Sequence, residues 1–466
     1  MKKVAVIIPV LLICMVSPVQ GQDETWENGL PDDPGFFPIA VWLQDPADAS
    51  AYRQGDVNLY IGLWQGPTED QLSALRTAGM PVMCSQNTTG LDHLEDSIIV
   101  GWTQQDEPDN AQPDGSGGYD PCIDPEVIQG LYDDLKANDP TRPVYLNLGQ
   151  GVSNTDWVGR GTCTGDTWMY PYYIEGCDIV SFDIYPVTSK YDHIKNNLWY
   201  VARGIDNLRE WSEDSKPVWC WIETTHISSQ SKPTPAQVKS EVWMALIHGA
   251  KGFGYFCHEW VPEFNANALL DDPVMFPAVT AINSRIHELA PVLNSPDKKD
   301  WVSVTSDNPD VPIDILVKHF RDTLYVFAVA MRDGAATGSF SVEGIQEDEV
   351  TVIGEDRDIE VTGGGFEDTF SGYEVHLYKM KYLDTGIERE PVRPVKIYPN
   401  PGSRYVTIPV ENPIQHCALT NLCGQVIPIR GIAGNRIDIS NCNPGMYVLH
   451  GWAANVPFQQ KIVIEN

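Results

Sequence analysis

Two neighbouring stretches, CDIVSFDIYP (177–186) and KPVWCWIE (216–223), decide the fold. Each is a short and almost continuously apolar run, which is typical of a strand buried on both faces of a parallel sheet. The segment between them, residues 191–211, has the length and apolar spacing of a helix. Together they predict two parallel strands that a helix connects.

The same alternation extends outward over about 260 residues, which agrees in number of strands and in size with a (β/α)8 TIM barrel. A doubly wound open sheet is the alternative, but no GxGxxG or P-loop sequence follows any of the strands. The six further apolar runs are 36–42, 57–64, 81–85, 98–103, 142–148 and 252–258. The further segments with helical spacing are 68–79, 124–138, 235–249 and 276–293.

The pattern changes past residue 300. Runs such as TLYVFAVAM (323–331) and GYEVHLYKM (372–380) alternate and are punctuated by Gly and Asp, which predicts an antiparallel β-sandwich. A polar, proline-containing segment then reads as a linker, and a small β domain follows it. We therefore expect a barrel over residues 22–298, a sandwich over 299–382, a linker over 383–394 and a terminal β domain over 395–466.

The first residues have the composition of an export signal. Lys2 and Lys3 precede the apolar run 4–16, and Val19-Gln20-Gly21 offers a small-residue cleavage site. We expect residues 1–21 to be a signal peptide, and no later stretch is long and apolar enough to span a membrane. The formal net charge of −33 argues against nucleic acid or an anionic membrane surface as a partner.

The ten cysteines show no CxxC or Cys/His spacing that would indicate a zinc site. Disulfides are expected for an exported chain, either between Cys122 and Cys163 or within the set Cys417, Cys423 and Cys442. Four cysteines inside apolar runs are expected to be buried small hydrophobic residues: Cys84, Cys177, Cys220 and Cys257.

The chemistry of such a barrel should lie at the carboxyl ends of its strands and in the loops that follow. These positions hold many carboxylates, amides and aromatic rings. They are Trp64, Asn87, Gln105, Asp106, Glu107, Asn147, Asp183, Tyr185, Glu223, His226, His258 and Trp260.

Glu107, after the fourth run, and Glu223, at the end of the seventh, resemble the catalytic pair of clan A retaining glycoside hydrolases. The resemblance covers most of residues 36–298, and it implies that Glu107 is the acid/base and Glu223 the nucleophile. Two carboxyls about 5–5.5 Å apart would act by double displacement. The sequence departs from the clan at Asp106, where these enzymes usually have an asparagine that contacts the sugar 2-hydroxyl.

The other candidates are expected to contact sugar. Trp64 and Trp260 would provide stacking surfaces for apolar pyranose faces. Asp183 would bind hydroxyls or tune a pKa, and His226 and His258 would bind hydroxyls or orient Glu223. We assign the remaining candidates to substrate binding as well, namely Asn87, Gln105, Asp106, Asn147 and Tyr185.

The last segment carries a second resemblance. VKIYPNPGSRYVTI (395–408), LTNLCGQVI (419–427), NPGMYVLHG (443–451) and the terminal KIVIEN resemble the C-terminal sorting domain of type IX secretion cargo. This resemblance implies the type IX machinery as a partner, and release from the cell or attachment to its outer surface. It implies no chemistry.

We therefore expect a secreted retaining glycoside hydrolase that cleaves β-linked plant or algal polysaccharides or their oligosaccharides, without a cofactor or metal. One alternative is a non-catalytic surface glycan-binding protein on the same barrel. Another is an inverting glycosidase that uses Asp106 or Asp183, with the two carboxyls roughly 6.5–9.5 Å apart.

Overall fold

The computed structural model describes residues 26–345, 347–382, 393–394, 398–400, 402–408, 414–421, 426–427, 429–453 and 456–465. The chain divides into two compact units, Met1–Leu383 and Asp384–Asn466. The expected signal peptide (1–21) and residues 383–392 of the expected linker lie outside the described residues.

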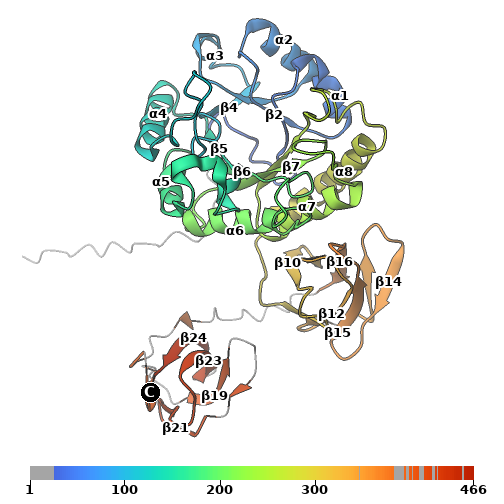
Figure 1. Cartoon of the computed structure of the whole chain (residues 1–466). Coiled ribbons are helices and arrows are strands. Elements are labelled where there is room, and N and C mark those ends of the chain that lie inside the picture. The colour runs from blue at the N-terminus through green and yellow to red at the C-terminus, as the bar shows by residue number, and fades with distance from the viewer. Residues whose placement is uncertain are drawn as a thin grey trace, which may run out of the picture. The chain divides into compact units, whose positions relative to one another are not determined.

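Eight parallel strands form a closed barrel in the first unit, which confirms the predicted fold (Figure 1). β8 pairs with β7 and closes the ring by pairing with β1, where Phe253 lies opposite Ile39. Each strand lies within its predicted apolar run. The strands are β1 (Ile39–Trp42), β2 (Leu59–Ile61), β3 (Val82–Cys84), β4 (Ile99–Thr103), β5 (Val144–Leu148), β6 (Ile179–Asp183), β7 (Val218–Glu223) and β8 (Gly252–Phe256).

Helices surround this barrel (Figure 1). α2 and α7 begin at capping boxes, in which Thr68 and Thr234 accept hydrogen bonds from the backbone three residues on. The helix expected over 191–211 begins only at Tyr200, because a loop in which Asn196 has a φ of 62° precedes it. The helices are α1 (Ala49–Gln54), α2 (Glu69–Ala78), α3 (Thr88–Asp92), α4 (Pro125–Asn138), α5 (Tyr170–Ile174), α6 (Tyr200–Trp211), α7 (Pro235–Ile247) and α8 (Met275–Leu293). Short 3-10 helices lie at Pro46–Asp48, Gln150–Val152, Val158–Cys163 and Thr167–Met169.

Both faces of the barrel strands are buried. On β7, Trp219 and Trp221 belong to the cluster of side chains inside the barrel, whereas Val218, Cys220 and Ile222 pack in the outer layer with the helices. This double burial explains why the strands read as continuous apolar runs without alternation. The other buried members of the inner cluster are Ala40, Leu59, Ile61, Met83, Val100, Tyr145 and Ile179.

The accessory domain consists of two antiparallel sheets with strand orders β10-β11-β16-β13-β14 and β15-β12-β9. It packs on the barrel: the rings of Trp243 on α7 and Phe327 on β11 have centroids 5.1 Å apart, and Ser240 Oγ donates to the carbonyl of Tyr373 at 2.5 Å. The strands are β9 (Val302–Ser306), β10 (Ile313–Phe320), β11 (Thr323–Ala330), β12 (Ala336–Val342), β13 (Glu349–Val352), β14 (Arg357–Glu360), β15 (Gly365–Phe370) and β16 (Val375–Lys381).

The second unit is a small β domain with sheets β17-β24-β23-β19-β20 and β18-β22-β21. Apolar side chains from both sheets, among them Val406, Ile437 and Leu449, form its core. The strands are β17 (Arg393–Pro394), β18 (Tyr405–Thr407), β19 (Ile414–Asn421), β20 (Val426–Ile427), β21 (Gly431–Ala433), β22 (Arg436–Asp438), β23 (Gly445–Ala453) and β24 (Val456–Ile464). In the described part of the chain, no helix has the length and apolar character needed to cross a membrane.

One of the expected disulfide pairs is present, between Cys122 and Cys163. In the C-terminal unit Cys417 and Cys442 are free thiols, and Cys423 lies outside the described residues. The four cysteines expected to be buried hydrophobic residues are buried and free: Cys84, Cys177, Cys220 and Cys257.

Candidate active site

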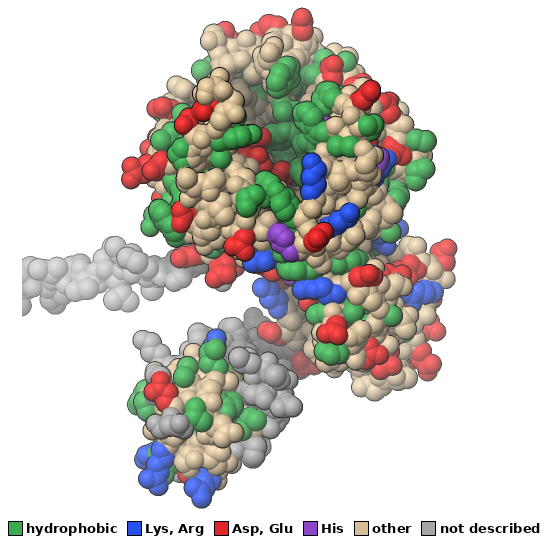
Figure 2. Space-filling model, in the orientation of Figure 1, with side chains coloured by type: hydrophobic (Ala, Val, Ile, Leu, Met, Phe, Trp, Pro, Cys, Tyr) green, Lys and Arg blue, Asp and Glu red, His purple; other side chains and the backbone are tan. Residues whose placement is uncertain are grey.

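Three carboxylic acids gather at the carboxyl ends of β4 and β6. Asp106 and Glu107 follow β4, and Asp183 is the last residue of β6. We call these three residues the mouth cluster. Electrostatic interactions link the members to one another, and all three retain solvent-accessible surface. Figure 2 shows a hollow in the barrel with acidic side chains inside it. Of the three residues, Asp106 is exposed, Glu107 and Asp183 are half-buried, and Oδ1 of Asp183 is buried without a hydrogen-bond partner.

The backbone of Glu107 has an unusual conformation. Its φ is +43°, a left-handed value that residues other than glycine rarely adopt. The Glu107 N–H donates to the carbonyl of Asn147 on β5 at 3.0 Å, and the Glu107 carbonyl accepts from the N–H of Asn110 at 3.1 Å. These bonds hold the strained residue in place, so that the β4 loop turns at Glu107.

The mouth cluster retains protons near neutral pH. Burial raises the pKa of Glu107 well above its usual value, and the neighbouring Asp183 carboxylate raises it further. Burial likewise raises the pKa of Asp183 to about 7. Two carboxyls this close resist carrying two negative charges, so the pair shares one proton over a range of pH. Asp106 meets solvent, yet desolvation by the surrounding protein raises its pKa, and the charge of Glu107 adds to the shift.

A chain of hydrogen bonds through the barrel interior ends on Asp106. Trp221 Nε1 donates to the Tyr145 hydroxyl at 2.9 Å, and that hydroxyl lies 2.5 Å from Ser181 Oγ. Ser181 Oγ donates to Asn147 Oδ1 at 2.7 Å, and Asn147 Nδ2 donates to Asp106 Oδ1 at 3.0 Å. Because the single Ser181 proton goes to Asn147, Tyr145 must be the donor to Ser181. The chain therefore presents Asp106 with a donor, which favours its ionised form.

Two loops beside the mouth are joined to each other. The Asp109 carboxylate is wholly buried, and it accepts from the N–H of Gly149 at 2.8 Å and from the Tyr170 hydroxyl at 3.0 Å. The Arg160 guanidinium is also wholly buried and donates to the Asp109 carbonyl at 3.0 Å. The disulfide Cys122–Cys163 adds a covalent link between the segment after β4 and the segment after β5. These bonds hold the loop after β4 and the loop after β5 in a fixed position relative to each other.

Aromatic rings are exposed on other loops at the carboxyl ends of the strands. Trp64, after β2, has 72% of its surface exposed, and Trp260, after β8, has 54%. Phe264 lies beside Trp260 with ring centroids 4.7 Å apart, and it is 59% exposed. Exposed rings of this kind have no role in a core, and they offer flat apolar surface to a ligand.

Glu223 lies in a different environment from Glu107. It has no exposed surface, and its two oxygens accept hydrogen bonds from the N–H groups of Val187 at 2.5 Å and Thr188 at 2.9 Å. Its neighbour is Glu241 of α7, which is also fully buried. We call Glu223 and Glu241 the buried pair. Burial raises the pKa of Glu223 to about 7 and raises that of Glu241 well above its usual value. The expected nucleophile therefore has no surface that a substrate could touch in this structure.

Two predicted binding residues have structural partners. Asn87 caps α3: its Oδ1 accepts from the N–H of Gly90 at 2.9 Å, and its Nδ2 donates to the carbonyl of Pro67 at 2.9 Å. His258 is 8% exposed and its Nε2 lies 3.1 Å from the amide nitrogen of Gln44. Burial lowers the pKa of His258, so this histidine is neutral and accepts the hydrogen bond.

Three other predicted residues stay open to solvent. Gln105 is exposed directly before Asp106, and Tyr185 is half-buried near Asp183. His226 Nδ1 lies 2.6 Å from the carboxylate of Glu259, and both side chains are partly exposed. The structure thus brings Gln105, Asp106, Glu107, Asn147, Asp183 and Tyr185 together, and it places Glu223, Asn87 and His258 in other surroundings.

Sequence reasoning missed Tyr145, Ser181, Asp109, Arg160 and Glu241. Polar residues inside the runs of β5 and β6 are a signal that could have identified Tyr145 and Ser181, because a buried polar group needs a partner. No comparable signal marks Glu241, which lies in the middle of an apolar helix. Within the described ranges, no group of three or more His, Cys, Asp or Glu residues is arranged to hold a metal ion.

Comparison with known families supports the sorting domain. Residues 396–465 match the family described as "Secretion system C-terminal sorting domain". This match confirms the expected sorting domain and indicates export to the cell surface or beyond it. No curated protein sequence matches the chain.

Several solved structures are similar to the chain at low identity. One is an α-amylase from Geobacillus thermoleovorans in complex with acarbose, with 10% identity and a TM-score of 0.46, covering 76% of this chain and 99% of that one. Another is a glycoside hydrolase family 30 subfamily 8 xylanase from Clostridium acetobutylicum, with 12% identity, a TM-score of 0.39, and coverage of 74% and 95%. A third is a family 51 α-L-arabinofuranosidase from Bifidobacterium longum, with 12% identity, a TM-score of 0.42, and coverage of 77% and 98%.

Proposed function

We propose that this chain is an exported glycoside hydrolase that cleaves a polysaccharide or its oligosaccharides, with Glu107 as the general acid. The observation that carries the proposal is the pairing of Glu107 with Asp183 at the open mouth of the barrel. Glycosidic cleavage needs a carboxylic acid that still holds its proton near neutral pH and can pass it to the leaving oxygen. The raised pKa of Glu107 gives it that proton, and its accessible surface allows contact with the substrate.

Asp106 is the carboxylate that we assign to the other half of the reaction. Asn147 donates a hydrogen bond to Asp106, which stabilises the charged form and fixes its direction. In its ionised form, Asp106 is an oriented and solvent-exposed carboxylate that can activate a water molecule for attack on the anomeric carbon, which is the inverting route. In this assignment Asp183 keeps the proton on Glu107, and Trp64 and Trp260 stack on sugar rings.

The retaining route through Glu223 is the second candidate. Glu223 lies at the end of β7. The resemblance to clan A enzymes implies that a glutamate at this place is the nucleophile that attacks a β-linked substrate. This route requires the loop at Val187 and Thr188 to move away, because the backbone of that loop now covers both carboxylate oxygens. We give this route the lower rank for that reason.

The C-terminal unit supports the location that we propose. Residues 395–466 would engage the type IX machinery after passage through the periplasm, and the barrel would then act at the cell surface or outside the cell. A large extracellular carbohydrate is a reasonable substrate for a protein that is exported in this way.

The test is release of reducing sugar from neutral and acidic plant and algal polysaccharides by the full chain. We expect Glu107→Gln to lose about a thousandfold in rate, the range for removal of a general acid. Most of this loss should disappear on an aryl glycoside with a good leaving group, which does not need the proton. Glu223→Gln should keep most of the activity.

Two results would contradict the proposal. Equal losses of activity in Glu107→Gln and Glu223→Gln, with both variants folded, would indicate that Glu223 is the nucleophile. The anomeric form of the first product, read by proton NMR, would then show retention. Retention of the wild-type chain on a polysaccharide column without any hydrolysis would indicate a glycan-binding protein instead.

A further inference from the structure

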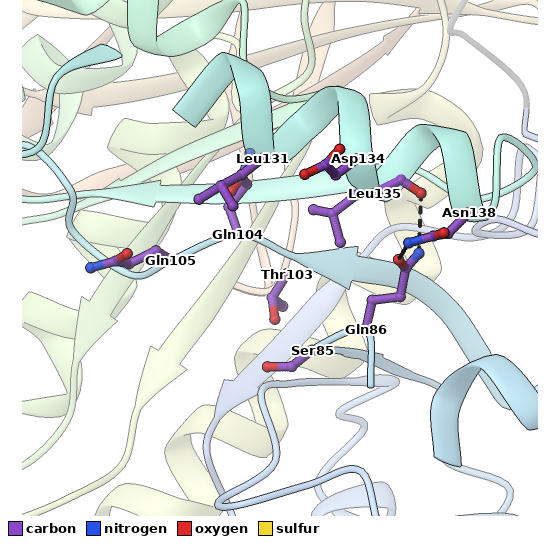
Figure 3. A pocket seen from close by; sticks show the side chains of 9 residues that line it. All are labelled: Ser85, Gln86, Thr103, Gln104, Gln105, Leu131, Asp134, Leu135 and Asn138. Carbon is purple, nitrogen blue, oxygen red and sulfur yellow. Dashed lines mark hydrogen bonds between the residues drawn. The ribbon is translucent and has the colours of Figure 1, made fainter. Parts of the chain in front are cut away.

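A cavity of about 330 Å³ lies beside the mouth cluster, between the ends of β3 and β4 and the helix α4. Figure 3 shows α4 on one side of it and the strand-end residues on the other. Gln105, which directly precedes Asp106, is one of the lining residues. The full lining is Ser85, Gln86, Thr103, Gln104, Gln105, Leu131, Asp134, Leu135 and Asn138.

Part of this lining is held rigidly by amide hydrogen bonds. Gln86 Nε2 donates to the carbonyl of Leu135 at 3.1 Å, and Asn138 Nδ2 donates to Gln86 Oε1 at 2.8 Å (Figure 3). Gln104 Nε2 donates to the carbonyls of Ile128 and Gly176, both at 2.9 Å. These bonds fix α4 against the strand ends, so the cavity exists before any ligand arrives.

Other polar groups of the lining are free to bind a ligand. In the described part of the chain, the hydroxyls of Ser85 and Thr103 and the carboxylate of Asp134 have no hydrogen-bond partner. Hydroxyls can donate and accept, and a carboxylate accepts from ligand hydroxyls. Leu131 and Leu135 add an apolar surface from α4. Hydroxyl-binding groups next to a small apolar patch complement a sugar ring, which has hydroxyls on its edge and C–H groups on its faces.

The charges around the cavity exclude an anionic ligand. Its lining contains no Lys, Arg or His, and its one charged residue is Asp134. Asp106, which follows directly after the lining residue Gln105, adds negative charge next to it when it is ionised. A uronate or sulfated sugar would have to bring a further negative charge next to the Asp134 carboxylate without a cationic partner in the lining, which is unfavourable.

We propose that this cavity is a subsite for one uncharged sugar residue of the substrate, and that it selects neutral glycans against acidic ones. The inference rests on the proposed function, because it places a second sugar unit beside the residues that would cleave the glycosidic bond. It adds the substrate class: a neutral oligosaccharide or polysaccharide with at least one sugar beyond the cleaved bond.

The first experiment places a larger side chain at the edge of the cavity, so that a sugar could no longer occupy it. Leu131 is 39% exposed, so Leu131→Trp can place a ring in the cavity without disturbing the core. Val127→Trp is the matched control, since Val127 lies on α4, is 52% exposed and does not line the cavity. We expect Leu131→Trp to raise KM for neutral oligosaccharides about tenfold with little change in kcat, the pattern for lost binding outside the reacting centre. Aryl glycosides of single sugars should be unaffected.

A charge reversal tests the selectivity. Asp134→Lys should lower KM for acidic oligosaccharides about tenfold relative to neutral ones of equal length. Equal kinetics of Leu131→Trp and Val127→Trp on every chain length would overturn the subsite. A wild-type preference for an acidic polysaccharide over its neutral counterpart would overturn the selectivity.

Failure of the proposed function can be told apart from failure of the subsite. If the wild-type chain hydrolyses nothing, affinity electrophoresis in gels that contain neutral polysaccharide reads the subsite directly. Retention that Leu131→Trp abolishes and Val127→Trp keeps would support the subsite without catalysis. Absence of retention for all three chains would overturn both proposals.

Discussion

Two groups of carboxylic acids in this barrel differ mainly in their access to water. The mouth cluster has solvent-accessible surface on all three members, whereas the buried pair has none. Burial raises the pKa of carboxyls in both groups, to about 7 for Asp183 and for Glu223. A raised pKa therefore does not by itself identify a catalytic group in this protein. Access of the substrate to the carboxyl is the additional requirement, and the buried pair, which has no exposed surface, does not meet it.

The largest effect that separates the two groups is expected at Asp183. Asp183→Asn removes the negative charge that raises the pKa of Glu107, so that pKa should fall. Since Glu107 must be protonated to act, the alkaline limb of the pH–rate profile should then move to lower pH by about one unit or more, and the rate at pH 7 should fall tenfold to a hundredfold. The measurement is kcat/KM on a neutral oligosaccharide between pH 4 and pH 9.

The exposed Asp156 provides the control for Asp183, because Asp156→Asn removes the same charge on the surface of the barrel. An unmoved alkaline limb in Asp183→Asn would show that Asp183 does not set the proton on Glu107. Loss of all activity at every pH would instead give Asp183 a direct part in the reaction.

The buried pair should affect stability where the mouth cluster affects rate. The folded-state pKa of Glu223 is raised above the unfolded value, so the folded chain binds a proton more tightly than the unfolded chain. The contribution of Glu223 to folding stability should therefore be greatest at acid pH and should decline as the pH rises from about 4.5 through about 7. Glu241→Gln removes one carboxyl, and its amide can donate to Glu223. We expect this variant to gain roughly 1–3 kcal/mol at pH 8 and little at pH 4.5.

Thermal unfolding of the full chain, followed by calorimetry at several pH values, measures this effect on the transition of the first unit. Glu210→Gln on α6 is the control, because Glu210 is exposed. If both variants show the same dependence on pH, the two buried carboxyls do not share a proton in the folded chain.

The same comparison shows how far the sequence could predict the site. The strands were predicted well because each is a continuous apolar run, and Asp106, Glu107 and Asp183 were found because they lie at or shortly after the ends of such runs. The burial of Glu223 could not be predicted, since the backbone of Val187 and Thr188 and the side chain of Glu241 produce it. These residues come from other parts of the sequence, and only the folded chain brings them to β7.

The interior of the barrel was harder to predict for a related reason. A strand that is buried on both faces shows no alternation, so its sequence does not tell which residues point inward. Tyr145 and Ser181 were therefore not recognised as partners of the predicted residue Asn147. The start of α6 was also predicted too early, because residues 191–199 have helical spacing and yet form a loop.

The smallest effect is expected at Tyr145, the middle of the hydrogen-bond chain that ends on Asp106. Tyr145→Phe keeps the ring and removes the hydroxyl, so Trp221 Nε1 loses its acceptor and Ser181 Oγ loses its donor. Ser181 can then rotate away from Asn147, and Asp106 becomes less well oriented. We expect kcat to fall about tenfold, the cost of one imperfectly held catalytic group, with KM unchanged. Trp221→Phe removes only the outer donor and leaves the bond from Tyr145 to Ser181, so its effect on kcat should be smaller. An equal loss in both variants, together with a raised KM, would mean that the chain supports the packing of the barrel interior and does not position Asp106.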